Sequence, residues 1–372
     1  MKTVNGHEII QCFEQFAPKS YAMEGDKIGL QIGKLNQPVK RVLIALDVLE
    51  PVVDEAIEQN VQLIIAHHPP IFRPLKSIRT DEPSGRLIEK LIKHDIAVYA
   101  AHTNLDVAPG GVNDLLAECL QLEETEVLVP TVEEQLNKLA VYVPVDHAAD
   151  VRNAIGNAGA GFIGEYSHCS FSVTGTGRFL PGNHANPYIG EKGKMEEVKE
   201  VRIETIYPKR LEKKILTAML KAHPYEEVAY DLYPLENKGK ILGLGRIGKL
   251  KEEMTLREFA HFVKTQLEVE GVRVVGNLES KVRKVAVLGG DGNKFYQSAL
   301  FKGADVYVTG DMYYHTAHDA MMAGLNIIDP GHNVEKVMKK GVANKLSAIS
   351  AEKGYDVEFI PSKVRTDPFQ FL

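Results

Sequence analysis

The chain has 372 residues, with 44 Lys and Arg against 50 Asp and Glu and a formal net charge of −6. Charged residues make up 25% and hydrophobic residues 44% of this ordinary globular composition, which excludes collagen, coiled coil and extended disorder. The length predicts two or three domains of about 150 residues each. Because the chain lacks a basic surplus, we expect no nucleic-acid or anionic-membrane partner.

The cysteines and the N-terminus bear on the compartment. Cys12, Cys119 and Cys169 are far apart and form no Cys-x-x-Cys pair, so neither a disulfide framework nor a thiolate zinc site is indicated. Glu8 and Glu14 interrupt the first apolar stretch, and no apolar run approaches about 18 residues. We therefore expect a cytoplasmic protein.

The N-terminal part, residues 1–129, predicts alternating helices and strands. Ile9, Ile10, Phe13 and Phe16 have helical spacing after Asn5, a good helix cap. Short apolar runs that predict strands are separated by helix-length segments at 51–60 and 84–94; the runs are 41–47 (RVLIALD), 62–66 (QLIIA) and 96–101 (IAVYAA). Near-continuous apolar strands alternating with helices indicate a parallel sheet covered on both faces.

The central part, residues 130–240, has a different pattern. Alternating runs at 138–144, 168–174 and 198–206 and helical stretches at 148–158 and 210–221 give a strand, helix, strand, strand, helix, strand order. That order is typical of a ferredoxin-like α+β domain. We predict an inserted domain here, joined by linkers at 129–134 and 236–240.

The C-terminal part, residues 241–372, returns to the first pattern. Residues 284–288 (KVAVL), 305–309 (DVYVT) and 326–329 (NIID) predict strands, each followed by a polar or Gly-rich turn and a helix-like segment. The predicted fold class is therefore α/β, with two α/β halves, 1–129 and 241–372, packed as one discontinuous domain around the insert.

Three polar clusters follow predicted strands, where open α/β sheets bind ligands. His67 and His68 follow the second strand, and neutral imidazole is the commonest biological metal ligand. Asp106 follows the third strand and has two oxygens that can bridge cations. His332 and Glu335, three residues apart at a helix start, face the same side.

Each cluster also has a purely structural interpretation. The histidine pair can serve as loop caps, Asp106 as a helix N-cap, and Glu335 as an acidic residue that complements a helix dipole. Together, however, three nitrogens and two carboxylates form a set suited to two divalent ions, which we favour. Zn, Fe, Mn and Co all accept such ligands.

Two further loops point to the same edge. After 305–309 come Asp311, which can orient a ligand, and His315, which can face a substrate. The Gly-rich run 289–292, with Gly290 and Asp291, either presents backbone N–H groups to a phosphate or forms a plain tight turn. His102 and His315 are candidate proton carriers. His223 in the insert is either a ligand or part of a helix stop before Pro224.

With these motifs in hand, the chain resembles the GTP cyclohydrolase I type 2 homolog family, also called the Ngg-interacting-factor-three-like family. The resemblance rests on the strings AHHPP (66–70), HTNLD (102–106), TGD (309–311), GHNVE (331–335) and GLQIG (29–33). It implies that His67, His68, Asp106, His332 and Glu335 bind two divalent metal ions. The chain departs from many members in having no Trp before GLQ.

The resemblance also implies a PII-like insert, which includes HPYEE at 223–227, and a toroidal homohexamer with the metal sites facing an internal cavity. The function it implies is metal-dependent hydrolysis of a nucleotide, namely opening of the guanine ring at C8 with release of formate. Two alternatives remain open: a metal-dependent phosphoesterase, and a non-enzymatic metal-binding regulator in which the insert senses a ligand or partner.

Overall fold

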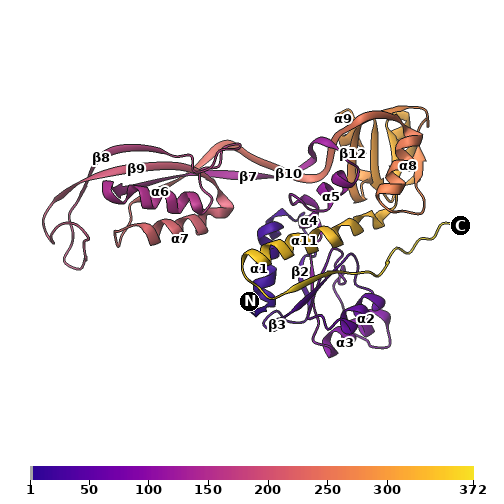
Figure 1. The fold of residues 1–372 in the computed structure, drawn as a ribbon, viewed down its shortest axis with the longest axis horizontal. Helices are drawn as coiled ribbons and strands as arrows, with labels where there is room; N and C mark the ends of the chain where they lie inside the picture. Colours follow the sequence, from indigo (N-terminus) through magenta and orange to yellow (C-terminus); the bar gives the residue numbers. More distant parts are fainter. Residues whose placement is uncertain (1–2) are drawn as a thin grey trace. The chain divides into compact units, whose positions relative to one another are not determined.

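The structure is a computed structural model that describes residues 3–372. It is a mixed α/β fold with several sheets (Figure 1), as the sequence predicts. The chain divides into two compact units: one combines the residues up to Val132 with Leu242–Leu372, and the other is Glu133–Ile241. Among the described residues, no helix is long and apolar enough to cross a membrane.

The first unit contains a five-stranded sheet built mainly by the N-terminal part. Its strand order is β15-β4-β5-β6-β2, and all neighbours are parallel except β2 against β6. The strands are β2 (Gly29–Ile32), β4 (Arg41–Ala45), β5 (Leu63–Ala66), β6 (Ala97–Ala100) and β15 (Glu358–Pro361). The parallel β4, β5 and β6 confirm the three predicted strands. The C-terminal β15, which we did not predict, adds a strand to this N-terminal sheet.

The second sheet of this unit is built by the C-terminal part. Parallel strands β12, β13 and β14 confirm the prediction, while β11 and β10 flank them in antiparallel pairing. The bounds are β10 (Tyr230–Thr255), β11 (Arg273–Val275), β12 (Lys281–Asp291), β13 (Val306–Gly310) and β14 (Asn326–Asp329). A small pair, β1 (Val4–Asn5) with β3 (Pro38–Val39), completes the strands of the unit.

Helices cover both faces of the five-stranded sheet. On one face, α2 and α3 pack against Leu43, Ile64 and Val98. On the other, α1, α5 and α11 share a continuous core with Ile44, Ile65 and the strands of the second sheet. The helices of this unit are α1 (Gly6–Phe16), α2 (Glu50–Glu58), α3 (Pro83–Lys93), α4 (Thr103–Val107), α5 (Val112–Cys119), α8 (Leu256–Gln266), α9 (Tyr296–Phe301), α10 (Tyr314–Met322) and α11 (Val337–Glu352). The predicted cap is confirmed: Asn5 and Glu8 form a capping box on α1.

The second unit has the order strand, helix, strand, strand, helix, strand. Its sheet order is β10-β7-β9-β8, and α6 and α7 run along one face of it (Figure 1). A separate core contains Val141, Ile203, Ile155 and Ile215. The remaining bounds are β7 (Glu123–Pro144), α6 (Ala148–Asn157), β8 (Phe171–Phe179), β9 (Glu196–Pro208) and α7 (Glu212–Ala222).

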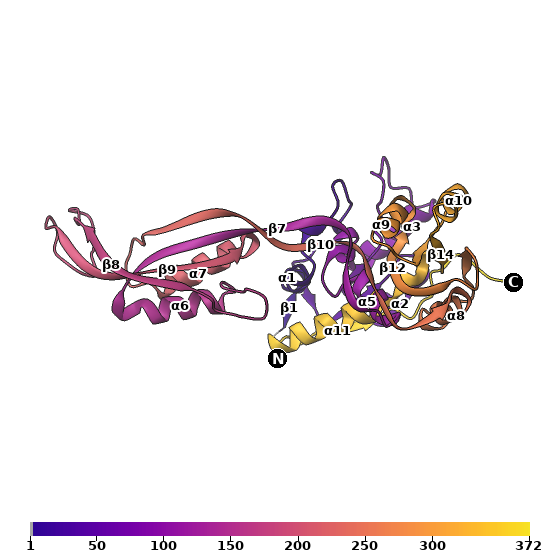
Figure 2. The same cartoon turned by 90° about the horizontal axis from the view of Figure 1, so that it is seen from above.

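Two local features differ from a simple expectation. The predicted linkers 129–134 and 236–240 lie in or next to the positions where the chain passes between the two units, but they are parts of the long strands β7 and β10, both drawn as continuous ribbons in Figure 2. The edge strand β8 begins at Phe171, three residues later than predicted, because His168 has a positive φ of 58° that interrupts extended backbone.

Candidate metal centre

The ends of three neighbouring elements bring the predicted residues together. The backbone N–H groups of His67 and His68 continue the pairing of β5 by donating to Ala45 O and Leu46 O, at 3.1 and 2.9 Å. His102 follows β6 and Asp106 lies in α4. After β14, Gly331 takes a φ of 85°, and the 3-10 turn His332–Lys336 then carries His332 and Glu335.

The donor atoms form three overlapping groups, within each of which one atom per residue lies no more than 4.8 Å from the others. The groups are His67, His68 and His102; His68, His332 and Glu335; and His67, Asp106 and Glu335. Oε2 of Glu335 lies 3.0 Å from Nε2 of His68 and 3.2 Å from Nε2 of His332. Nε2 of His67 lies 3.5 Å from Oδ1 of Asp106 and 3.7 Å from Oε2 of Glu335. The carboxylate shared by two groups is therefore that of Glu335 rather than Asp106.

Four histidines of this cluster are oriented by a hydrogen bond from Nδ1 to an acceptor. A carboxylate accepts from each of three rings: Asp47 from His68 at 2.7 Å, Asp26 from His102 at 2.8 Å and Asp311 from His332 at 2.7 Å. The carbonyl of Ala101 accepts from His67 at 2.9 Å. Since each of these partners is an acceptor, Nδ1 carries a proton, and Nε2 of His67, His68 and His332 faces the cluster. This is the arrangement that orients metal-ligating histidines.

Burial gives an independent test of whether a cation fits. His67 is fully buried, and Glu335 and Asp106 are 3% and 9% exposed. Within residues 3–372, Nε2 of His67 and Oδ1 of Asp106 are buried without a hydrogen-bond partner. Leaving such atoms unpaired is costly, and a divalent cation would satisfy both. The donor set, imidazole nitrogens with carboxylate oxygens, matches Zn, Fe, Mn or Co.

The electrostatics of the cluster are those of a site that attracts positive charge. Burial alone would lower the pKa of His68 and His332, but bonds to Asp47, Asp311 and Glu335 raise these values to about 9 and about 10. Burial would raise the pKa of Glu335, yet the surrounding imidazoles hold it well below its usual value. Burial raises the pKa of Asp106 to about 6.

Gly290 has no side chain, and this leaves room for Glu335 and His332 of the cluster. Gly290, in β12, has a φ of 66°, and a Cβ there would lie 2.8 Å from Oε1 of Glu335 and 3.2 Å from Nε2 of His332. Gly289 donates its N–H to Asn113 at 3.0 Å. The first three residues of the run 289–292 are therefore the end of β12 beside the cluster, and Gly292 precedes the 3-10 turn Asn293–Phe295 that leads into α9.

The other predicted site residues divide into those near the cluster and those away from it. Asp311 supports His332, and His102 belongs to one of the donor groups. Asp106 lies inside α4 and does not cap a helix. The carboxylate of Asp291 is used by Asn293 and Tyr313. His315 is exposed on α10 with its ring against Tyr314, outside the three donor groups.

Sequence analysis missed the supporting residues Asp26 and Asp47. Asp26 also accepts from the backbone and the hydroxyl of Thr103, and Asp47 accepts from the hydroxyl of Thr366. Asp47 ends a predicted strand, which is the signal that could have found it. Asp26 lies in an irregular segment, 76 residues before the histidine that it holds.

Comparisons with known proteins agree with this architecture. The description Duf34/NIF3 (NGG1p interacting factor 3) matches residues 4–368. A Bacillus subtilis (strain 168) protein named GTP cyclohydrolase 1 type 2 homolog is 65% identical over 371 residues, covering 100% of both chains. The crystal structure of a Bacillus cereus protein related to NIF3 is 64% identical, covers 100% of both chains and has a TM-score of 0.95. A Staphylococcus aureus structure is 32% identical over 100% of both chains, with a TM-score of 0.76. The chain therefore belongs to the Duf34/NIF3 family.

Proposed function

We propose that the cluster holds two divalent metal ions per chain. His67, Asp106 and Glu335 would hold one, and His68, His332 and Glu335 the other, with the Glu335 carboxylate shared. The support is the overlap of the two donor groups at Glu335, together with the unpaired buried atoms of His67 and Asp106. A carboxylate shared between two ions is a common feature of two-metal sites.

We further propose that the protein is a metal-dependent hydrolase acting on a nucleotide, by hydrolytic opening of the guanine imidazole ring of GTP at C8 with release of formate. The convergence of six donor residues at one partly open edge carries this proposal, and the names of the relatives point to the substrate. The ions would supply Lewis acidity and an activated water.

The side chains around the ions have distinct tasks in this reaction. His67 and Glu335 are buried and exclude bulk water from the inner side of the site. His102 is partly exposed, and its Nδ1 is fixed by Asp26, so Nε2 can pass a proton between the site and solvent. Asp47 and Asp311 hold His68 and His332 in their orientations.

The test combines metal content with a product assay on the same samples. Elemental analysis of the native protein should give about two divalent ions per chain, lost in the His67→Ala/His332→Ala double variant. His315→Ala, which changes an exposed histidine outside the cluster, should keep the metal. Native metal-loaded protein should then release formate from GTP while the double variant does not. Metal-loaded protein that forms neither formate nor a pterin contradicts the cyclohydrolase proposal, and absence of metal contradicts both proposals.

Two ions that share Glu335 would also suit in-line displacement at a phosphoester, which is the second candidate. A panel of phosphoesters, assayed with native protein and the double variant, separates the two activities. If native metal-loaded protein turns over neither GTP nor any phosphoester, the remaining proposal is a metal-binding regulator whose insert senses a ligand.

We also propose, from the family resemblance, that the insert is PII-like and that the chain forms a homohexamer. Light scattering coupled to size-exclusion chromatography should then give six times the chain mass of 41.2 kDa. A monomer or dimer would contradict the hexamer.

A further inference from the structure

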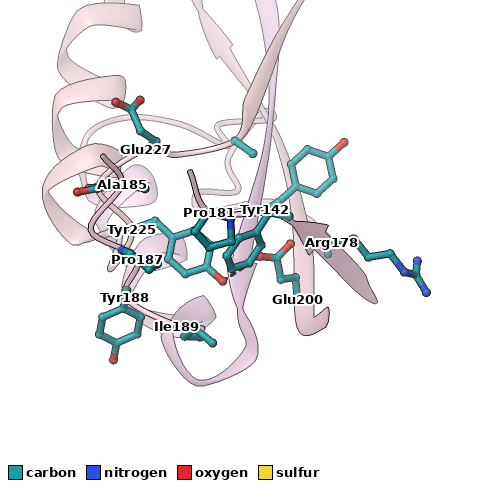
Figure 3. A pocket seen from close by; sticks show the side chains of 14 residues that line it. Tyr142, Arg178, Pro181, Ala185, Pro187, Tyr188, Ile189, Glu200, Tyr225 and Glu227 are labelled. Carbon is teal, nitrogen blue, oxygen red and sulfur yellow. Dashed lines mark hydrogen bonds between the residues drawn. The ribbon is translucent and has the colours of Figure 1, made fainter. Parts of the chain in front are cut away.

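The second unit contains a cavity of about 320 Å³ that the metal centre does not use. It lies where the ends of β7, β8 and β9 meet the loop at 180–190 and the segment after α7, and Figure 3 shows its lining. The volume falls within the range of small-molecule pockets. All of its lining residues belong to Glu133–Ile241, so the cavity is a feature of this unit alone.

Aromatic rings form much of the lining. The Tyr225 ring is central: its centroid lies 6.1 Å from that of Phe179 and 6.4 Å from that of Tyr188. Tyr142 also lines the cavity, together with Pro181, Pro187 and Ile189. A ligand in this space would contact several π faces and little polar surface.

The position of Tyr225 is fixed by His223, which is 7% exposed. Nε2 of His223 donates to the carbonyl of Tyr142 at 2.9 Å, and Nδ1 accepts the backbone N–H of Tyr225 at 3.1 Å. Both ring nitrogens are therefore used, and burial lowers the pKa of His223, which favours the neutral ring. His223 is a structural residue that sets the aromatic wall and not a ligand.

A buried carboxylate faces the same space. Glu200 is 9% exposed, and its Oε1 accepts from the Tyr225 hydroxyl at 3.1 Å. In the part of the chain that the structure describes, its Oε2 has no hydrogen-bond partner. Gly177 leaves room for this oxygen, since a Cβ there would lie 2.2 Å from it.

The remaining charges in the lining leave Glu200 without a cation. Arg178 extends away from Tyr225 and Glu200 in Figure 3 and donates to Glu197 at 2.7 Å. Glu226 accepts from the backbone of Asn186 at 2.7 Å, and Glu227 adds a further negative charge. The lining therefore holds three carboxylates and one arginine that is already paired.

We propose that this cavity binds a small organic cation of the alkylammonium class, with its charge at Glu200 and its carbon atoms against Tyr225, Phe179 and Tyr188. Aromatic faces attract cations through their quadrupoles, and a buried carboxylate strengthens that attraction by direct charge pairing. A neutral ligand would gain the apolar contacts but leave the Glu200 charge uncompensated. The proposal is independent of the metal centre and of the hydrolase proposal.

The test compares cations with neutral isosteres on the full-length protein. The probes are benzylammonium against benzyl alcohol, and choline against 3,3-dimethylbutan-1-ol, titrated by NMR with labelled isoleucine methyl groups. We expect each cation to bind about tenfold or more tightly than its isostere. The Ile189 methyl in the lining should shift, while that of Ile215 in the core should not.

Two matched variants locate the charge. Glu200→Gln keeps the shape and the acceptor for the Tyr225 hydroxyl, and should abolish the preference for the cation. Glu165→Gln removes an exposed carboxylate of the same unit, outside the lining, and should change affinity less than twofold. Equal affinity for cation and isostere, no saturable cation binding, shifts that spare Ile189, or an equal effect of both variants would overturn the proposal. The isostere comparison decides the matter even if Glu200→Gln does not fold.

Discussion

The carboxylates behind the histidines are the residues through which the cluster can be tuned without touching a proposed ligand. Asp311 has a φ of 54°, a left-handed conformation that asparagine also tolerates, so Asp311→Asn preserves the backbone and the acceptor oxygen. The substitution removes the charge that makes the His332 ring a stronger ligand. We expect roughly 10- to 100-fold weaker metal binding, measured by competition with a chromophoric chelator.

The control for this prediction is Asp291→Asn in β12. Asp291 accepts hydrogen bonds from Asn293 and Tyr313 and from no histidine of the cluster. Its substitution should leave the affinity within about threefold, because indirect charge effects decline with distance. Equal losses in the two variants would mean that general negative charge, and not the bond to His332, supports the metal.

The raised pKa values of His68 and His332 predict that metal binding depends on pH. With pKa values of about 9 and about 10 in the absence of metal, both rings are positively charged at pH 7 and carry a proton on Nε2 as well as on Nδ1. An imidazole that binds a metal through Nε2 has no proton on that atom. Binding must therefore release protons, and lowering the pH weakens it by about tenfold per unit for each proton released. Calorimetric titration in two buffers of different ionisation enthalpy measures the number of protons released when the metal binds. Identical heats in both buffers would contradict the prediction.

At the scale of elements, the close approach of β12 to the cluster makes Gly290 a sensitive position. Gly290→Ala should reduce metal affinity at least tenfold, because the new Cβ would press on Glu335 and His332. Gly303→Ala is the matched control: Gly303 has a φ of 71°, but nothing lies within 4 Å of a Cβ there. Both variants should lose about 1 kcal/mol or more of stability from the left-handed backbone, yet only Gly290→Ala should lose metal. If Gly303→Ala also lost metal, the loss of metal in Gly290→Ala would be explained by lower stability of the folded protein and not by the contact with Glu335 and His332.

The sequence correctly predicts those strands whose run of apolar residues is also buried in the structure. Strands β4, β5, β6, β13 and β14 are short apolar runs, and His67, Asp106 and His332 follow such strands closely enough to be grouped from their positions in the chain. Residues 129–134 (VPTVEE) contain a proline and two charges, and residues 236–240 (ENKGK) are polar with a glycine, so both resemble linkers, but cross-strand pairing keeps them extended. The strand β15 was missed because its partner β4 lies more than 300 residues earlier, which no local pattern reveals.

At the scale of the whole molecule, the two units have separate hydrophobic cores. The core with Val141 and Ile215 contains residues of the insert only, whereas the cores around Ile44, Leu43 and Val285 contain residues of the first unit only. All six donor residues of the cluster lie in the first unit. The proposed metal centre therefore draws no ligand from the insert, and the proposed organic-cation cavity draws no residue from the first unit.

This separation predicts the outcome of removing the insert. Strands β7 and β10 lie side by side near Val129 and Gly243, where a Cβ on Gly243 would lie 1.9 Å from the Val129 carbonyl oxygen, so a short Gly-containing loop can join Val132 to Leu242. We expect the shortened protein to fold and to bind the same number of metal ions as the full chain, but to lose choline and benzylammonium binding. Elemental analysis and the NMR titration measure the two properties. The shortened protein carrying His67→Ala is the control and should lose metal. A folded shortened protein, verified by circular dichroism, that binds no metal would show that the cluster depends on the insert.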